Sequence, residues 1–251
     1  MSYDRVTAII EIAVKGGGTV RFVLAFALAL FIAFACTNQL KKAPMAFYAL
    51  SIAAVAVYAY GISQGPAVGF WGFFTPFMQR CTLAMAFFVI VMFIGVFDES
   101  SPIRKKLLPV RRQLSICGCL LCLSHVFYYA KTYLSQLGSS PQLQFAGSSG
   151  NLVLSLTISV ILVLLLAVLG ITSCTFVKAK MKASSWKNIQ RLSYAFFTLI
   201  IVHLGIILVP PALSGNIPAI ESVVVWGLVF ALYAVLKIKR EIKLRRAADG
   251  A

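Results

Sequence analysis

The only two histidines of this 251-residue chain both lie inside long apolar runs. His125 belongs to "RRQLSICGCLLCLSHVFYYAK", and His203 belongs to "WKNIQRLSYAFFTLIIVHLGIILV". Ionisable side chains are costly at membrane depth, so an intramembrane histidine marks a functional site by default. Imidazole binds iron, zinc and copper, and it also carries protons. The two positions therefore predict cofactor ligation or a polar path, with plain hydrogen bonding between helices as the alternative.

The elements that carry these histidines are expected to be membrane-spanning helices. The chain is 60% hydrophobic and 12% charged, whereas a soluble domain is about 45–50% apolar and about 25% charged. Its mean hydropathy is +0.91. Runs long enough to cross the ~30 Å hydrocarbon core predict an all-α integral membrane protein, a bundle of about seven transmembrane helices. The expected spans are 19–36, 44–62, 77–97, 113–131, 151–173, 190–209 and 220–237.

The charged residues predict how this bundle is oriented. The basic residues behind the net charge of +16 concentrate in four segments, 37–43, 98–112, 174–189 and the tail 238–251. The other loops carry no Lys or Arg; they are 63–76, 132–150 and 210–219. The positive-inside rule then places the C-terminus in the cytoplasm and the N-terminus outside, as a multi-pass protein of the inner (cytoplasmic) cell membrane. The basic clusters are expected to contact anionic lipid and no nucleic acid. The aromatic "FWGFF" of the outer loop 63–76 suits the membrane interface.

The N-terminal part allows a second interpretation. "LALFIAFAC" could be a signal-peptide core with cleavage after Ala35. Cleavage would leave six spans and put the basic loop 98–112 outside, against the charge rule, so we expect an uncleaved helix. The preceding segment 1–18 is expected to hold an interfacial helix over 3–15. The expected organisation is 1–18, the first three helices in 19–97, a core with both histidines in 98–209, a last helix in 210–237 and a basic cytoplasmic tail in 238–251.

Both imidazoles are expected at the same membrane depth. His125 lies 13 residues after Arg112, and His203 lies 12 residues after Arg191. At a rise of ~1.5 Å per residue, both rings lie roughly 18–20 Å from the inner charges, past the bilayer midplane. Zinc would need further protein ligands, and a proton relay would need a carboxylate, which spans two to six lack. Haem needs only two axial ligands, because its porphyrin supplies the other four. The pattern therefore favours one haem held by His125 and His203.

Further residues are candidates for the haem pocket. Those on the same helix face as a histidine, one or two turns away, are Gly118, Tyr129, Phe196 and Leu199. Gly118 is expected to leave room for a flat macrocycle. Arg80 and Arg21, near outer helix ends, are expected to meet the haem propionates. The six cysteines, including "CGCLLC" at 117–122, are interpreted as small packing residues.

Three segments resemble the ferric-reductase-like transmembrane domain family, and within it the haem-binding membrane subunit of the bacterial periplasmic methionine sulfoxide reductase system. They are "RRQLSICGCLLCLSHVFYY", "LAVLGITS" and "WKNIQRLSYAFFTLIIVH", within residues 100–208. The resemblance implies a six-helix core plus one extra span, and it places His125 and His203 at the family's haem-ligand positions. Gln190 stands where the family has a histidine before Arg-Leu. The resemblance therefore implies a single haem b in the outer half and no inner haem.

The expected function is a membrane-bound b-type cytochrome subunit of an oxidoreductase system, with no catalytic residue of its own. Two axial imidazoles saturate the iron, which favours electron transfer over oxygen chemistry. No Gly-rich nucleotide loop is present, so the expected donor is a membrane quinol, with a cytoplasmic flavin reductase as second choice. The acceptor is expected outside, as a flavoprotein, a molybdenum reductase or ferric iron. Whether the chain itself binds a flavin stays open.

The competing interpretation is a non-redox transporter or membrane scaffold whose histidines line a polar path. Helices broken near the midplane by Gly or Pro would support it. The two spans that carry the histidines contain no proline.

Overall fold

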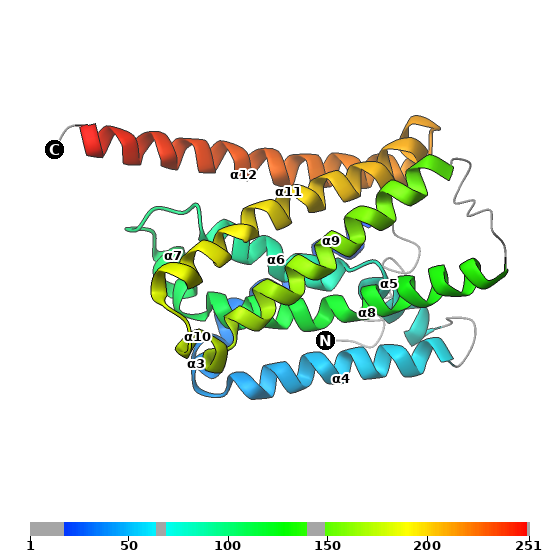
Figure 1. Cartoon of the computed structure of the whole chain (residues 1–251), viewed down its shortest axis with the longest axis horizontal. Coiled ribbons are helices and arrows are strands. Elements are labelled where there is room, and N and C mark those ends of the chain that lie inside the picture. Colours follow the sequence, from blue (N-terminus) through cyan, green and yellow to red (C-terminus); the bar gives the residue numbers. More distant parts are fainter. Residues whose placement is uncertain (1–17, 64–68, 140–148, 250–251) are drawn as a thin grey trace, which may run out of the picture. The chain divides into compact units, whose positions relative to one another are not determined.

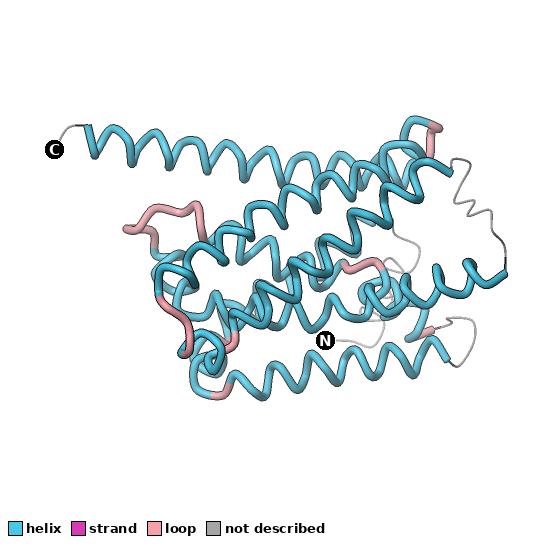
Figure 2. Tube along the Cα trace, in the orientation of Figure 1, coloured by secondary structure: helices cyan, strands magenta, loops and turns pink. Residues whose placement is uncertain are grey.

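The computed structural model describes residues 18–63, 69–139 and 149–249, which form helices joined by short connections (Figures 1 and 2). Within these ranges there is no strand. Six described helices are long and apolar enough to cross a membrane, and the bent pair α5 (Phe70–Gln79) and α6 (Thr82–Ile94) brings the number to as many as seven. By the length and composition of its helices, this is an all-α multi-pass membrane protein. The interfacial helix expected over 3–15 lies outside the described residues.

The elements follow the order of the seven apolar runs. Around α5 and α6 they are α2 (Gly18–Ala35), α3 (Thr37–Lys42), α4 (Pro44–Ser63), α7 (Pro102–Leu107), the 3-10 helix η1 (Leu108–Val110), α8 (Arg111–Ser139), α9 (Ser149–Ser173), α10 (Thr175–Ala179), α11 (Ala183–Leu213) and α12 (Ile217–Asp249). The chain forms two compact units, Met1–Ser124 with Val224–Ala251, and His125–Val223. The boundary within α8 therefore falls inside the expected core 98–209.

In the first unit, α6 is the buried centre. Ten of its 13 residues are buried, which fits a helix that is apolar on every side. It packs against α2, whose buried face is formed by Phe22, Ala25, Ala29 and Ala33. Alanines at four-residue spacing form one face of a helix and let a neighbouring backbone approach closely.

The third span differs from the continuous helix expected over 77–97. α5 begins at Phe70, inside the segment expected to be an outer loop, and α6 follows after a bend of 47°. Cys81, between the two helices, has a φ of 60°. That left-handed conformation is uncommon for a residue other than glycine, and it interrupts the helix. The "FWGFF" segment is helical, with the rings of Phe70 and Phe74 stacked at 5.5 Å.

Two helices continue into segments expected to be loop or tail. α11 runs through Pro210 and Pro211 before it ends at Leu213. Prolines lack an amide donor, and the helix stops two residues after the second one. α12 then begins with a side-chain cap, in which Asn216 Oδ1 accepts a hydrogen bond from the Ala219 amide at 3.1 Å. It continues through the basic tail to Asp249.

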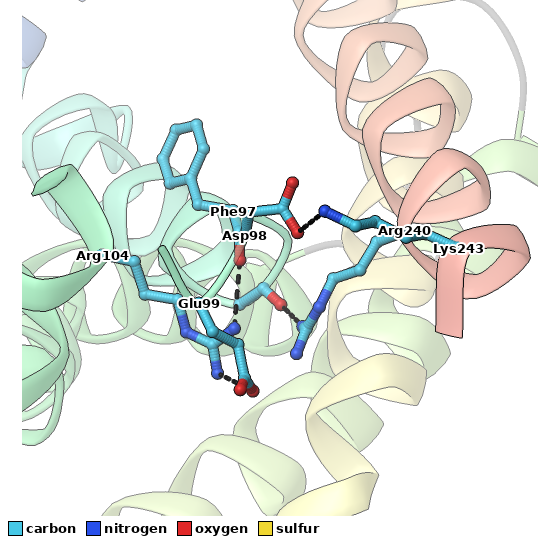
Figure 3. Close-up of polar contacts among 7 residues, drawn as sticks. Phe97, Asp98, Glu99, Arg104, Arg240 and Lys243 are labelled. Carbon is cyan, nitrogen blue, oxygen red and sulfur yellow. Dashed lines mark hydrogen bonds and ion pairs between the residues drawn. The ribbon is translucent and has the colours of Figure 1, made fainter. Parts of the chain in front are cut away.

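The basic tail is held by the connection between α6 and α7 in the first unit (Figure 3). Arg240 donates to the carbonyl of Gly95, and Lys243 Nζ lies 3.0 Å from a carboxylate oxygen of Asp98. Arg104 donates to a carbonyl of the same connection at 3.1 Å. The tail and the basic loop 98–112, which charge patterning assigns to one side of the membrane, therefore lie at the same end of this unit.

The outer faces of the long helices are apolar. Leu50 on α4 and Leu164 on α9 are 64% and 62% exposed within the chain. Such side chains, on helices of spanning length, are suited to contact with lipid acyl chains.

Candidate functional site

His203 lies where α11 packs against α9 in the second unit. The two helices run alongside one another (Figure 1). Nδ1 of His203 lies 3.5 Å from Oγ of Ser159 on α9, and the ring is half-buried. The packing of α9 on α11 therefore orients this imidazole.

The hydrogen bonds of Ser159 indicate which tautomer His203 adopts. The serine hydroxyl has one proton, which it donates to the carbonyl of Ser155 at 2.7 Å. Its oxygen is then left to accept a hydrogen bond from Nδ1–H of His203. We infer a neutral imidazole with its free lone pair on Nε2. Metal-binding histidines use this arrangement, in which one ring nitrogen binds the metal while a hydrogen bond fixes the other.

His125 lies on α8, in the part of that helix that belongs to the same unit. Its ring centroid is 4.7 Å from that of Tyr129, one turn further along. The imidazoles of His125 and His203 interact electrostatically with each other. The structure thus brings both predicted ligands together, from the non-adjacent helices α8 and α11.

The α9–α11 pair is fixed at a second point, which sequence analysis missed. Trp186 Nε1 donates to the carbonyl of Thr172 at 3.0 Å, and Gln190 Nε2 donates to the hydroxyl of Thr172 at 3.0 Å. Thr172 lies 13 residues after Ser159, and Gln190 lies 13 residues before His203. In antiparallel helices equal spacing means one register. The contact at Thr172 therefore sets the register that brings Ser159 to His203.

Two predicted pocket residues lie on α11 before His203. Phe196 is buried and Leu199 is half-buried. The ring of Phe196 packs at 5.6 Å from that of Phe197. Both residues are placed to pack around the His203 face of α11, and their role towards a cofactor stays a prediction.

Gly118 has a different surrounding from the one expected. A Cβ atom at this position would lie 2.8 Å from Cε1 of Phe88 on α6. The aromatic ring fills the space that was expected to admit a macrocycle. Gly118 therefore allows α8 and α6 to pack closely in the first unit.

Arg80 lies in the first unit, at the bend between α5 and α6. It is exposed within the chain and interacts electrostatically with Arg21 on α2. The Nε atom of Arg21 is buried without a hydrogen-bond partner. Two neighbouring guanidinium groups would suit an anionic group, and the expected contact with haem propionates stays a prediction.

The described part of the chain contains no group of three or more His, Cys, Asp or Glu side chains placed to hold a metal ion. Within these residues the histidine pair offers two donors. A metal bound there would need further ligands from a non-protein group.

Comparison with known proteins gives one relative of unassigned activity. An uncharacterized protein of Treponema pallidum (strain Nichols) is 33% identical over 216 residues, an alignment that covers 84% of this chain and 58% of that protein. The chain thus spans little more than half the length of this relative. No family model matches the chain, and no solved structure matches it.

Proposed function

We propose that this protein is a membrane-bound electron-transfer subunit in which His125 and His203 hold one haem b. The observation that carries the proposal is the pairing of the chain's two imidazoles from α8 and α11. The hydrogen bond that leaves Nε2 of His203 available as a ligand supports it.

The residues present fit a cofactor that brings most of its own ligands. Haem, when bound, supplies four equatorial nitrogens and a one-electron carrier. His125 and His203 would provide the axial donors, and Ser159 would hold His203 in the tautomer that ligation requires. Tyr129, against the His125 ring, and the apolar Phe196 and Leu199 would keep water away from the site.

A single haem follows from the hydrogen bonding of Gln190. In the ferric-reductase-like family a histidine precedes the Arg-Leu pair, and here Gln190 donates to Thr172 instead. With no inner imidazole at this position, we propose one haem in the outer half. The donor is then a membrane quinol, or secondarily a cytoplasmic flavin reductase. The acceptor is an extracytoplasmic flavoprotein or molybdenum reductase.

The proposed orientation has the N-terminus outside and the C-terminus in the cytoplasm, in the inner cell membrane. It rests on the basic loops and on the contact of the tail with the α6–α7 connection. In this orientation the basic tail would also meet the anionic lipids of the inner leaflet.

A redox difference spectrum tests the proposal. The full chain, expressed with haem supplementation and purified in detergent, should show a b-type α band on dithionite reduction. His125→Ala and His203→Ala should each lose the band, because either change removes one axial ligand. A colourless wild-type protein that is folded and monodisperse would contradict the proposal. Reduction of the band by a quinol analogue would identify the donor.

A second candidate function has one specific observation in its favour. The break between α5 and α6, with a bend of 47°, is a discontinuous helix of the kind that transporters use at their binding sites. The candidate is a non-redox transporter in which the histidines line a polar path. A folded but colourless protein, together with substrate flux in proteoliposomes that His203→Ala abolishes, would favour this candidate.

A further inference from the structure

We propose that Cys81 and Cys122 form a redox-active dithiol that a lipid-soluble quinone oxidises to a disulfide. Both are free thiols, and their Sγ atoms lie 3.5 Å apart. Cys81 lies at the break between α5 and α6, and Cys122 lies on α8, so the contact joins two parts of the first unit. The proposal is independent of the haem.

The backbone at Cys81 is unusual. With φ at 60° it has a left-handed conformation, in which glycine or asparagine would be at ease. Among the described residues, no other side-chain-bearing residue has a positive φ. Such conformations persist where the surrounding structure imposes them, and they cluster at functional sites. This one separates α5 from α6 and places the Cys81 thiol against Cys122.

The Cys122 side of the pair is held on both flanks. Two residues after it, the buried hydroxyl of Ser124 lies 2.7 Å from the carbonyl of Leu121 and 3.1 Å from the carbonyl of Met78 on α5. Four residues before it, Gly118 packs against the ring of Phe88 on α6. α8 is therefore in close contact with both halves of the broken span. These contacts keep the two sulfurs in register, which lowers the entropic cost of joining them.

The reaction is a two-electron oxidation. The S–H bonds of Cys81 and Cys122 break, an S–S bond forms, and two protons and two electrons leave. A quinone takes up both and becomes a quinol. A disulfide has an S–S length of about 2.0 Å, so the sulfurs need to approach by ~1.5 Å from their separation of 3.5 Å.

The location of the pair determines the class of oxidant. Both thiols belong to apolar spans, from the α5–α6 pair and from α8. Charged oxidants such as glutathione disulfide are excluded from hydrocarbon, whereas a quinone dissolves in it. Oxidation would tie the break between α5 and α6 covalently to α8.

The test uses the full chain in proteoliposomes after reduction with dithiothreitol and its removal. Decylubiquinone, whose fully substituted ring resists addition of thiols, is the oxidant, and glutathione disulfide is the hydrophilic comparison. Remaining thiols are counted with a maleimide after opening the membrane with detergent, and cross-linked peptides are identified by mass spectrometry. We expect decylubiquinone to remove two thiols per chain, yield one quinol and give the Cys81–Cys122 peptide, which dithiothreitol reverses. Glutathione disulfide should react far more slowly.

Variants identify the pair. Cys81→Ser and Cys122→Ser should each stop thiol loss and quinol formation, while the matched control Cys119→Ser on α8 should behave like the wild type. Helical circular dichroism and a monodisperse profile show that each variant is folded. A wild-type protein without the Cys81–Cys122 peptide would overturn the proposal. So would equal thiol loss in folded Cys81→Ser protein.

Discussion

Replacing Ser159 with alanine tests how the site prepares His203 for ligation. The change removes an oxygen 3.5 Å from Nδ1 and leaves the ring itself in place. Loss of such a supporting hydrogen bond typically lowers metal affinity about 10–100-fold. A distance of 3.5 Å is at the long end for a hydrogen bond, so we expect the lower limit, about tenfold, or ~1.4 kcal/mol.

The assay is a hemin titration of the apoprotein in detergent, followed in the Soret region, together with the midpoint potential of the bound haem. Ser159→Ala should weaken binding and shift the potential, while Ser159→Thr should retain most of the affinity because it keeps the hydroxyl. Thr157→Ala is the matched control, since its hydroxyl lies on the exposed side of α9 and bonds to the Val153 carbonyl at 2.9 Å. If Ser159→Ala binds hemin as tightly as wild type while His203→Ala does not, the assignment of the His203 tautomer is refuted.

Two further predictions concern packing and register. Gly118→Ala should be ~1–3 kcal/mol less stable than Gly227→Ala, because both gain the helix propensity of alanine but only the first forces a Cβ to within 2.8 Å of the buried Phe88 ring. Thermal unfolding by circular dichroism measures this, and equal midpoints would contradict it. Trp186→Phe and Gln190→Ala should each cost about 1 kcal/mol, because each removes one hydrogen bond to α9. Each should also weaken hemin binding through the α9–α11 register, and an unchanged affinity in both would show that this register does not depend on the contact.

The membrane spans could be predicted because hydropathy is a local property. Each apolar run of the sequence corresponds to one described helix or to the bent pair. The break at Cys81 could not be predicted, since nothing in the composition of 77–97 distinguishes it from a continuous helix. It depends on tertiary contacts, such as the hydroxyl of Ser124 near the carbonyl of Met78. Pro210 and Pro211 were interpreted as a loop, although a helix tolerates proline near its end when few hydrogen bonds are lost.

The site could be predicted in part. The equal depth of His125 and His203 follows from counting residues, but the role of Ser159 does not. Serine and threonine in apolar helices usually bond to their own backbone, as Thr157 does, so the sequence offers no signal that selects Ser159. The error at Gly118 has a similar cause. Its helix face was predicted from α8 alone, whereas the space beside it is filled by Phe88 of another helix.

The central claim is that His125 and His203 bind the same iron. Electron paramagnetic resonance of the oxidised, haem-loaded protein tests it most directly. We predict one low-spin ferric signal of the bis-imidazole type per chain, and its replacement by a high-spin signal or its loss in either His125→Ala or His203→Ala. A high-spin wild-type signal, or a low-spin bis-imidazole signal that survives either substitution, would contradict the account.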